Sequence, residues 1–325
     1  MQKQEILEIL NCYGIFSVNE YKVIDSTNLD DYRLNIIIDN KYVLRINNAT
    51  ITEERLQSIS RLCERYRTIG VLTPRLYKSI YGTYLTNYGE HVCYVSNYLN
   101  YATEEESECD HTQVRTEVLK SIGALSAQYS DTDLAPVNSM WSLIDLAPLD
   151  TDIDEKQENL NPLVDALINI GESSLANRVV AFNTQKREKI RAIYKHLPRC
   201  VIQGDLNPSN ILVEKNHFVG LIDFNMSGTE VNVNHFCCET NGYIKEEDFL
   251  SKNADVIYTE WVSSQNEEIN IILNEYPLNE LEKSVIEDYR SICLISQYPN
   301  VMDYLYFMES DKEKLLKIIE LILQR

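Results

Sequence analysis

Long apolar runs and an excess of positive charge are both absent from this 325-residue sequence. No run approaches the roughly 20 apolar residues of a membrane-spanning helix, so we expect a cytoplasmic protein with no membrane partner. Lys and Arg number 30 against 50 Asp and Glu, a formal net charge of -20, which disfavours binding to nucleic acid or anionic lipid. The N-terminal "MQKQEILEILNCYGI" lacks the basic start and cleavage site of a signal peptide and predicts an amphipathic helix.

Paired cysteine spacing is also missing. The eight cysteines are scattered through apolar or helical contexts, without the spacing of zinc ligands or of a small disulfide scaffold. We therefore expect reduced cysteines that serve in packing. What the chain does contain is ordinary for a globular protein: 44% apolar and 25% charged residues, enough for one large domain or two unequal lobes.

The first hundred residues predict a sheet with one helix. Residues 50–70 place apolar side chains at helical spacing, with Thr52 as a cap and Gly70 as the stop. "DN" before Lys41 predicts a tight turn between two strands. The predicted strands, rich in β-branched and aromatic residues, are 21–25, 32–39, 42–47 and two more within 73–99.

The chain becomes mostly helical after a predicted boundary near residues 97–100. An acidic stretch rich in Pro, Asp and Asn, residues 131–162, predicts an irregular connector. One hairpin is predicted within the helices, at residues 201–224. A small mixed lobe followed by a larger helical lobe indicates a bilobal α+β enzyme with a cleft.

The hairpin "VIQGDLNPSNILVEKNHFVGLIDF" carries three polar residues that a hairpin does not need. The loop "LNPS" brings Asp205 and Asn210 into one small space, and the second strand returns Asp223 beside Asn210. Two carboxylates and an amide oxygen suit Mg²⁺ shared with a phosphate, with one aspartate left to accept a proton from an attacking hydroxyl. The structural alternative is that Asp205 and Asn210 cap a turn and Asp223 ends a strand.

"QGDLNPSNILV" followed by "GLIDF" resembles the catalytic loop and metal-binding segment of the aminoglycoside phosphotransferase and choline kinase group, a branch of the protein-kinase-like superfamily. The resemblance implies a bilobal kinase-like fold, with a nucleotide-binding lobe at residues 1–98 and a catalytic and acceptor-binding lobe at 99–325. It further implies Asp205 as catalytic base, Asn210 and Asp223 as Mg²⁺ ligands, and ATP or GTP as phosphoryl donor.

The same resemblance implies a nucleotide site in the first lobe. Arg45 in "YVLRIN" occupies the position of the basic residue that contacts phosphates and pairs with an acid on the following helix. Glu54 is the expected partner and Glu53 the alternative. Direct alignment of this helix with the family consensus, however, places the acid's position nearer Ile59 than either glutamate.

Two further segments of the first lobe are expected at the nucleotide. Ser26 and Asn28 lie in the loop "DSTNLDDY", which has no glycine, and would donate to phosphate. The backbone of Asn97 and Leu99 would receive the adenine. Gln203 stands where the family usually has His.

Acidic runs in the second half of the chain suit a cationic acceptor, although charged helix faces are usually only solvated. Five aromatic residues there would suit a cation box or, more commonly, a core: Tyr258, Trp261, Tyr289, Tyr304 and Tyr306. Three hypotheses follow: a kinase of a small cationic substrate, a nucleotide-binding pseudokinase, and a kinase of a neutral metabolite such as homoserine or a sugar.

Overall fold

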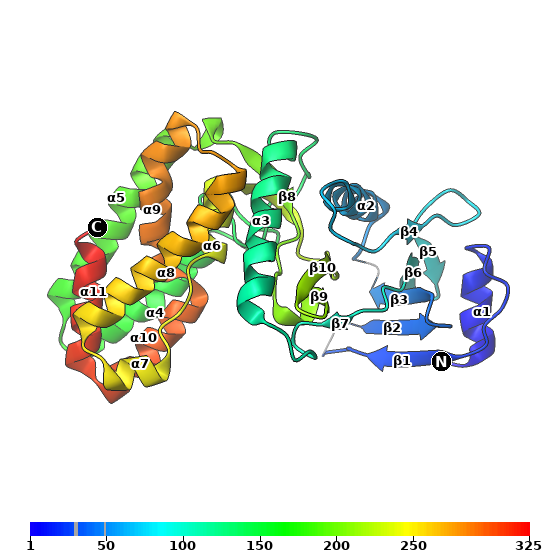
Figure 1. Cartoon of the computed structure of the whole chain (residues 1–325), viewed down its shortest axis with the longest axis horizontal. Coiled ribbons are helices and arrows are strands. Elements are labelled where there is room, and N and C mark those ends of the chain that lie inside the picture. The colour runs from blue at the N-terminus through cyan, green and yellow to red at the C-terminus, as the bar shows by residue number, and fades with distance from the viewer. Residues whose placement is uncertain (29–31, 49) are drawn as a thin grey trace. The chain divides into compact units, whose positions relative to one another are not determined.

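The computed structural model describes residues 1–28, 32–48 and 50–325 of the chain (Figure 1). Residues 29–31, in the middle of the predicted phosphate loop, lie outside the described residues. The chain forms two compact units. Residues 1–114 and 205–225 form the sheet unit, and residues 115–204 and 226–325 form the helical unit. An antiparallel sheet region and a larger helical region confirm the predicted α+β class.

The sheet unit is built on an antiparallel sheet in the order β1-β2-β3-β6-β4, with β5 paired to β6. Asp39 and Asn40 adopt positive φ values of 50° and 51°, as expected for the two-residue turn between β2 and β3. The predicted strands and this turn are confirmed. The bounds are β1 Tyr21–Asp25, β2 Arg33–Ile38, β3 Tyr42–Asn48, β4 Leu76–Tyr77, β5 Thr86–Tyr88 and β6 His91–Asn97.

Helix α1 (Lys3–Asn11) covers one face of this sheet. Its Ile6 and Leu10 are fully buried against Leu44 and Ile46 of β3 and other apolar side chains. Each such side chain contributes about 1.5–3 kcal/mol on burial. Because side chains alternate along a strand, Arg45 on β3 is directed away from this core.

Helix α2 (Glu53–Thr68) follows the sheet's third strand. Thr52 caps it as predicted, with Oγ1 accepting a hydrogen bond from Arg55 N at 3.2 Å. Gly70, at φ +87°, ends it in the left-handed conformation that glycine adopts without strain. The predicted helix and both of its end signals are confirmed.

The predicted hairpin consists of β9 (Ile211–Glu214) and β10 (His217–Leu221), and β7 (Ala102–Thr103) pairs with β9. Ile211 lies opposite Leu221 and Glu214 opposite His217, with a bulge between Phe218 and Gly220. A short helical turn, η2 (Pro208–Asn210), precedes β9. All of this lies within the sheet unit.

The helical unit also contains a two-stranded sheet, β8 (Arg199–Ile202) with β11 (Gly228–Val231), that the sequence analysis missed. Helix α4 begins at Glu155, so the predicted irregular connector is wrong from that residue onward. Helix α4 ends at Asn169, and α3 (His111–Tyr129) starts in the sheet unit. The remaining helices are α5 Ser173–Ile193, α6 Asn232–Glu239, α7 Glu246–Ser251, α8 Ala254–Glu275, α9 Glu280–Ser296, α10 Tyr298–Ser310 and α11 Lys312–Leu323.

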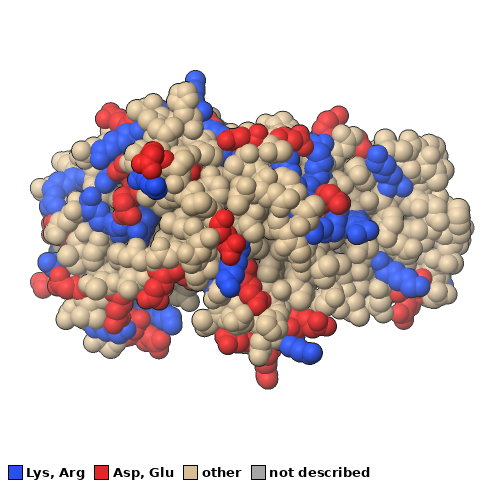
Figure 2. Space-filling model, turned by 45° about the horizontal axis from the view of Figure 1, so that its top comes forward, with Lys and Arg blue, Asp and Glu red and all other residues tan. Residues whose placement is uncertain are grey.

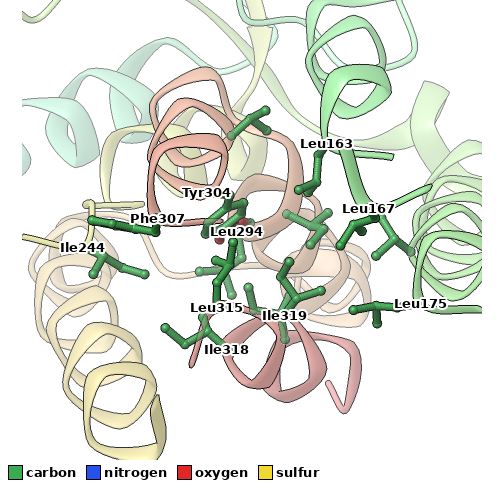
Figure 3. Close-up of a cluster of buried hydrophobic side chains, with 14 of the residues drawn as sticks. Leu163, Leu167, Leu175, Ile244, Leu294, Tyr304, Phe307, Leu315, Ile318 and Ile319 are labelled. Carbon is green, nitrogen blue, oxygen red and sulfur yellow. Dashed lines mark hydrogen bonds between the residues drawn. The ribbon is translucent and has the colours of Figure 1, made fainter. Parts of the chain in front are cut away.

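The core of the helical unit gathers side chains from seven of these helices, α4, α5 and α7–α11 (Figure 3). Leu163 and Leu167 of α4 are fully buried with Leu294 of α9 and Ile319 of α11. Among the residues that the structure describes, no helix has the length and apolar character to cross a membrane.

Candidate active site

The first part of the site is the loop from Asp205 to Asn210, which the short turn η2 folds back on itself. Asn210 Nδ2 donates to the Asp205 carboxylate at 2.8 Å and to its backbone carbonyl at 3.0 Å. Asn207 Nδ2 donates to the other carboxylate oxygen of Asp205. Asp205 is partly exposed, while Asn210 is 8% exposed. The structure therefore brings the first two predicted residues together.

Asp223 is placed by the second strand of the hairpin. Ile222 N donates to Asn210 O at 3.0 Å, which puts the residue before Asp223 directly beside Asn210. Asp223 adopts a positive φ of 52° and accepts from Asn225 N at 3.2 Å. In the described chain, the amide oxygen of Asn210 has no hydrogen-bond donor. Asn210 Oδ1 and the partly exposed Asp223 are hard oxygen donors of the kind that Mg²⁺ prefers.

A cavity of about 390 Å³ opens beside these residues, entirely within the sheet unit. It is lined by Asn210 and Asp223 together with three cationic side chains from neighbouring strands, Lys22, Arg33 and Arg45. Three cations at one cavity are notable in a chain of net charge -20. Such side chains attract phosphate oxygens. Of these three cations only Arg45 was predicted, because the composition of β1 and β2 does not show which of their side chains face the cavity.

Arg45 does not form the expected ion pair. Its Nη1 donates to Ser96 Oγ at 3.0 Å, and its guanidinium lies 5.7 Å from the centre of the Tyr94 ring. No carboxylate pairs with Arg45 within residues 1–28, 32–48 and 50–325. The buried Ile59 of α2 lines the same small cavity as Arg45, so helix α2 presents an apolar side chain there.

Neither candidate glutamate of α2 contacts Arg45. Glu53 accepts hydrogen bonds from the backbone N–H groups of Tyr84 and Leu85, at 3.0 and 2.9 Å. Glu54 is exposed. The role assigned to Glu54 stays a prediction. Another residue of α2, Arg55, donates from Nη2 to the carbonyl of Asn225 at 2.7 Å, and burial lowers its pKa.

The predicted adenine-binding segment lines the cavity. Asn97 and Leu99 are both among its lining residues. The N–H of Asn97 donates to Arg75 O at 3.1 Å, and that of Tyr98 donates to Lys41 O at 2.7 Å. In the part of the chain that the structure describes, the N–H of Leu99 makes no hydrogen bond. The Leu99 N–H therefore remains available to a nucleobase.

Of the two candidate residues in the predicted phosphate loop, one lines the cavity. Ser26 lines it, and its N–H donates to Arg33 O at 2.9 Å. Asn28 is exposed and is not among the lining residues. The roles of both residues remain predictions.

The residues before Asp205 are supported inside the helical unit. Gln203, which stands in place of the usual His, is fully buried. Gly204 adopts φ +84°, and a Cβ there would lie 2.4 Å from Met226 O, so only glycine fits. Trp141 Nε1 donates to the carbonyl of Gly204 at 2.6 Å. Nothing in the sequence analysis pointed to Trp141, because it lies in the irregular acidic segment far from the motif.

The polar segment after Asp223 is structural. Glu230 is 3% exposed and accepts hydrogen bonds from Ser139 and Ser142, which lie near Trp141 in the chain. Asn234 donates to the carbonyl of Trp141 at 2.8 Å. These hydrogen bonds hold the segment around Trp141 in place.

The acidic and aromatic residues of the helical unit do not form a cation box. Tyr289 and Tyr304 are fully buried, and Trp261 is 6% exposed. Asp248 and Glu260 both pair with Lys252. Charges of both signs are interspersed over the face drawn in Figure 2. Tyr289, Tyr304 and Trp261 follow the core alternative, whereas Tyr306 is exposed. The acids Asp248 and Glu260 are neutralised in part by Lys252.

Comparison with known proteins identifies the class to which this fold and site belong. The model of the phosphotransferase enzyme family, APH, matches residues 24–230, which is more than half of the chain. The chain therefore belongs to the phosphotransferase enzyme family. The predicted family, the kinase-like fold and phosphotransferase activity toward a hydroxyl group are confirmed. A search of curated proteins gave no significant match.

Solved structures with the same fold cover almost the whole chain. A microcompartment-associated aminopropanol kinase is 13% identical with a TM-score of 0.55, covering 99% of this chain and 94% of its own. The spectinomycin phosphotransferase APH(9)-Ia, in complex with ADP and spectinomycin, is 13% identical with a TM-score of 0.51, covering 100% and 99%. An amicoumacin kinase, in complex with AMP-PNP, Ca²⁺ and Ami, is 11% identical with a TM-score of 0.50, covering 100% and 94%.

Proposed function

We propose that this chain transfers the γ-phosphate of ATP or GTP to a hydroxyl of a small cationic substrate of the aminoglycoside or choline kind. The observation that carries the proposal is the hairpin and the loop before it, which hold Asp205 against Asn210 and bring Asp223 beside Asn210. Asn210 and Asp223 line a cavity together with Lys22, Arg33 and Arg45. Complexes of the structural relatives with ADP or AMP-PNP and Ca²⁺ support a nucleotide and a divalent ion.

Each group has a proposed role in the transfer. Asp205 accepts the proton of the acceptor hydroxyl as its oxygen bonds to the γ-phosphorus and the bond to the β-phosphate oxygen breaks. Asn210 Oδ1 and Asp223 would hold Mg²⁺, which when bound neutralises charge on the transferred group. The cations Arg45 and Lys22 hold phosphate oxygens.

The nucleobase and the phosphates of the nucleotide are proposed to bind to groups that other contacts leave accessible. The backbone of Asn97 and the Leu99 N–H would bind the adenine or guanine edge, and Ser26 would contact phosphate. Asn28 is proposed to contact phosphate and Glu54 to pair with Arg45 in the nucleotide complex, although neither lines the cavity.

The test measures thermal stabilisation by Mg-ATP and Mg-GTP, and then nucleotide consumption with pooled aminoglycosides, choline-like amines, homoserine and sugars. Asp223→Asn should remove the stabilisation, whereas Asp165→Asn, at an exposed position of α4, should leave it unchanged. Consumption triggered by a cationic pool supports the proposal. Consumption with homoserine or sugars only, and a Michaelis constant insensitive to salt, would favour a neutral acceptor. Stabilisation without consumption by any pool would favour the pseudokinase.

A further inference from the structure

A second cluster of chemically active side chains lies in the sheet unit, apart from the hairpin residues assigned above. Glu104, Cys109 and His111 bring one ligand atom each within 4.8 Å of one another. Within the described part of the chain, no other three His, Cys, Asp or Glu residues do so. The sequence analysis assigned Cys109 to packing, because one cysteine and one histidine two residues apart do not make a recognisable ligand motif.

The distances between these ligand atoms are close to those of a tetrahedral metal site. His111 Nδ1 lies 2.8 Å from Glu104 Oε1 and 3.9 Å from Cys109 Sγ. With metal–nitrogen and metal–sulfur bonds of about 2.0 and 2.3 Å, ligand atoms in such a site lie about 3.3–3.6 Å apart. The three side chains therefore need only small rotations, and the side chain of His111, 68% exposed, is able to make them.

The backbone that carries the three ligands is anchored. Glu104 follows β7 directly, and its N–H donates to Ile211 O of β9 at 2.8 Å. Asp110, between the two other ligands, accepts hydrogen bonds from the N–H groups of Thr112 and Gln113 at 3.1 Å and so caps α3. A metal ion would join the end of β7 to the start of α3. An anchored set of ligands loses less conformational entropy on binding than a flexible loop.

The ligand types select the kind of metal. A thiolate, an imidazole and a carboxylate together suit Zn²⁺ and related transition metals, whereas Mg²⁺ and Ca²⁺ prefer oxygen ligands alone. Glu104 has a side chain only 9% exposed, and in the described chain its carboxylate has no ionic partner other than His111. A divalent ion would neutralise this largely buried acid in a chain that carries a large negative charge.

We propose that Glu104, Cys109 and His111 form a binding site for Zn²⁺, with the fourth position open to water. The site is independent of the kinase site, since it shares no residue with it and its sulfur and nitrogen ligands disfavour Mg²⁺. It holds one metal ion per chain.

Cobalt titration of the purified, metal-free protein tests the site, because a cobalt–thiolate bond gives a charge-transfer absorption that oxygen ligands do not. Wild type should show this absorption, saturating at one equivalent and displaced by Zn²⁺. Cys109→Ser should abolish it, and His111→Gln should weaken binding at least about 10-fold. Cys12→Ser, at the other partly exposed cysteine, and Asp223→Asn should behave as wild type.

Protection from alkylation is a second measurement that requires no substitution. Zn²⁺ should slow modification of Cys109 by iodoacetamide at least about 10-fold, while Cys12 of the same molecules serves as the internal reference. The proposal is overturned if no charge-transfer absorption arises, if Cys109→Ser retains it, or if Zn²⁺ leaves the alkylation rate of Cys109 unchanged.

Discussion

Asp154 of the helical unit and Asp205 of the sheet unit are both held by several hydrogen bonds, but the two carboxylates differ in burial. Asp154 is 4% exposed, and its two oxygens accept from the guanidinium of Arg187 at 2.6 and 2.8 Å. Asp205 is partly exposed, and the neutral amides of Asn207 and Asn210 orient it. A guanidinium neutralises the buried carboxylate of Asp154 within the fold, whereas side-chain amides orient the partly exposed carboxylate of Asp205.

The largest expected effect follows from removing the charge of Asp205. Asp205→Asn should lower kcat by roughly 10²–10⁴-fold, because the acceptor hydroxyl loses its base. Nucleotide affinity and the free energy of unfolding should stay near wild type. Steady-state kinetics with the identified acceptor measure the fall in kcat, and urea unfolding measures the free energy of unfolding. Full activity in this variant would show that Asp205 is not the base.

The matching experiment in the helical unit should affect stability instead. Arg187→Met leaves the buried Asp154 without its cation and should lower the free energy of unfolding by about 3–5 kcal/mol. Arg178→Met removes an exposed pair with Glu320 and should cost less than about 1 kcal/mol. Urea unfolding of the two variants measures the contrast, and equal losses would contradict it.

Trp141→Phe should have a smaller effect that concerns the site alone. It removes the hydrogen bond to the Gly204 carbonyl, worth about 1 kcal/mol, and should lower kcat by about 5-fold with nucleotide affinity unchanged. Trp261→Phe is the control, since Trp261 Nε1 donates in the same way to Asn241 O at 2.7 Å, away from the motif. Equal losses of kcat in both variants would indicate a general destabilisation.

The smallest effect is the contribution of Asp154 to the dependence of stability on pH. Burial alone raises the pKa of Asp154, but the hydrogen bonds and charge of Arg187 lower it overall below the ordinary value of 3.8. A lowered folded-state pKa means that the stabilisation is complete above 3.8 and is lost as the pH falls through the folded value. The stability difference between wild type and Asp154→Asn should therefore shrink below about pH 4. A difference that is constant between pH 5 and 2 would disprove this.

Much of the sheet unit could be predicted from local sequence. Strand composition, the Asp39–Asn40 turn and the Thr52 cap act over a few residues, so each leaves a signal in the sequence. The hairpin around Asp205 and Asp223 was predictable for the same reason. Alternation alone did not show which face of β1 and β2 meets the cavity, and Lys22 and Arg33 were therefore missed.

The parts that could not be predicted depend on contacts between distant residues. The support of Gly204 by Trp141 joins residues 63 positions apart, and no local pattern marks it. The pairing of Arg45 was predicted from family position, but the turn of α2 facing it carries Ile59. Strands β8 and β11 are four residues long and pair across 25 intervening residues, so their sequences alone gave no sign of a sheet.

Gly220 of β10 has no proposed contact with nucleotide or metal, but the hairpin that carries the site depends on its lack of a side chain. Leu72, just after α2, accepts from Leu221 N at 2.8 Å and donates to Val219 O at 2.9 Å. A Cβ at Gly220 would lie 2.5 Å from Leu72 O, so any larger side chain separates the two segments. A mutational scan that reads only activity would group Gly220 with the catalytic residues, and a parallel scan of protein abundance would be needed to tell the two kinds of intolerance apart.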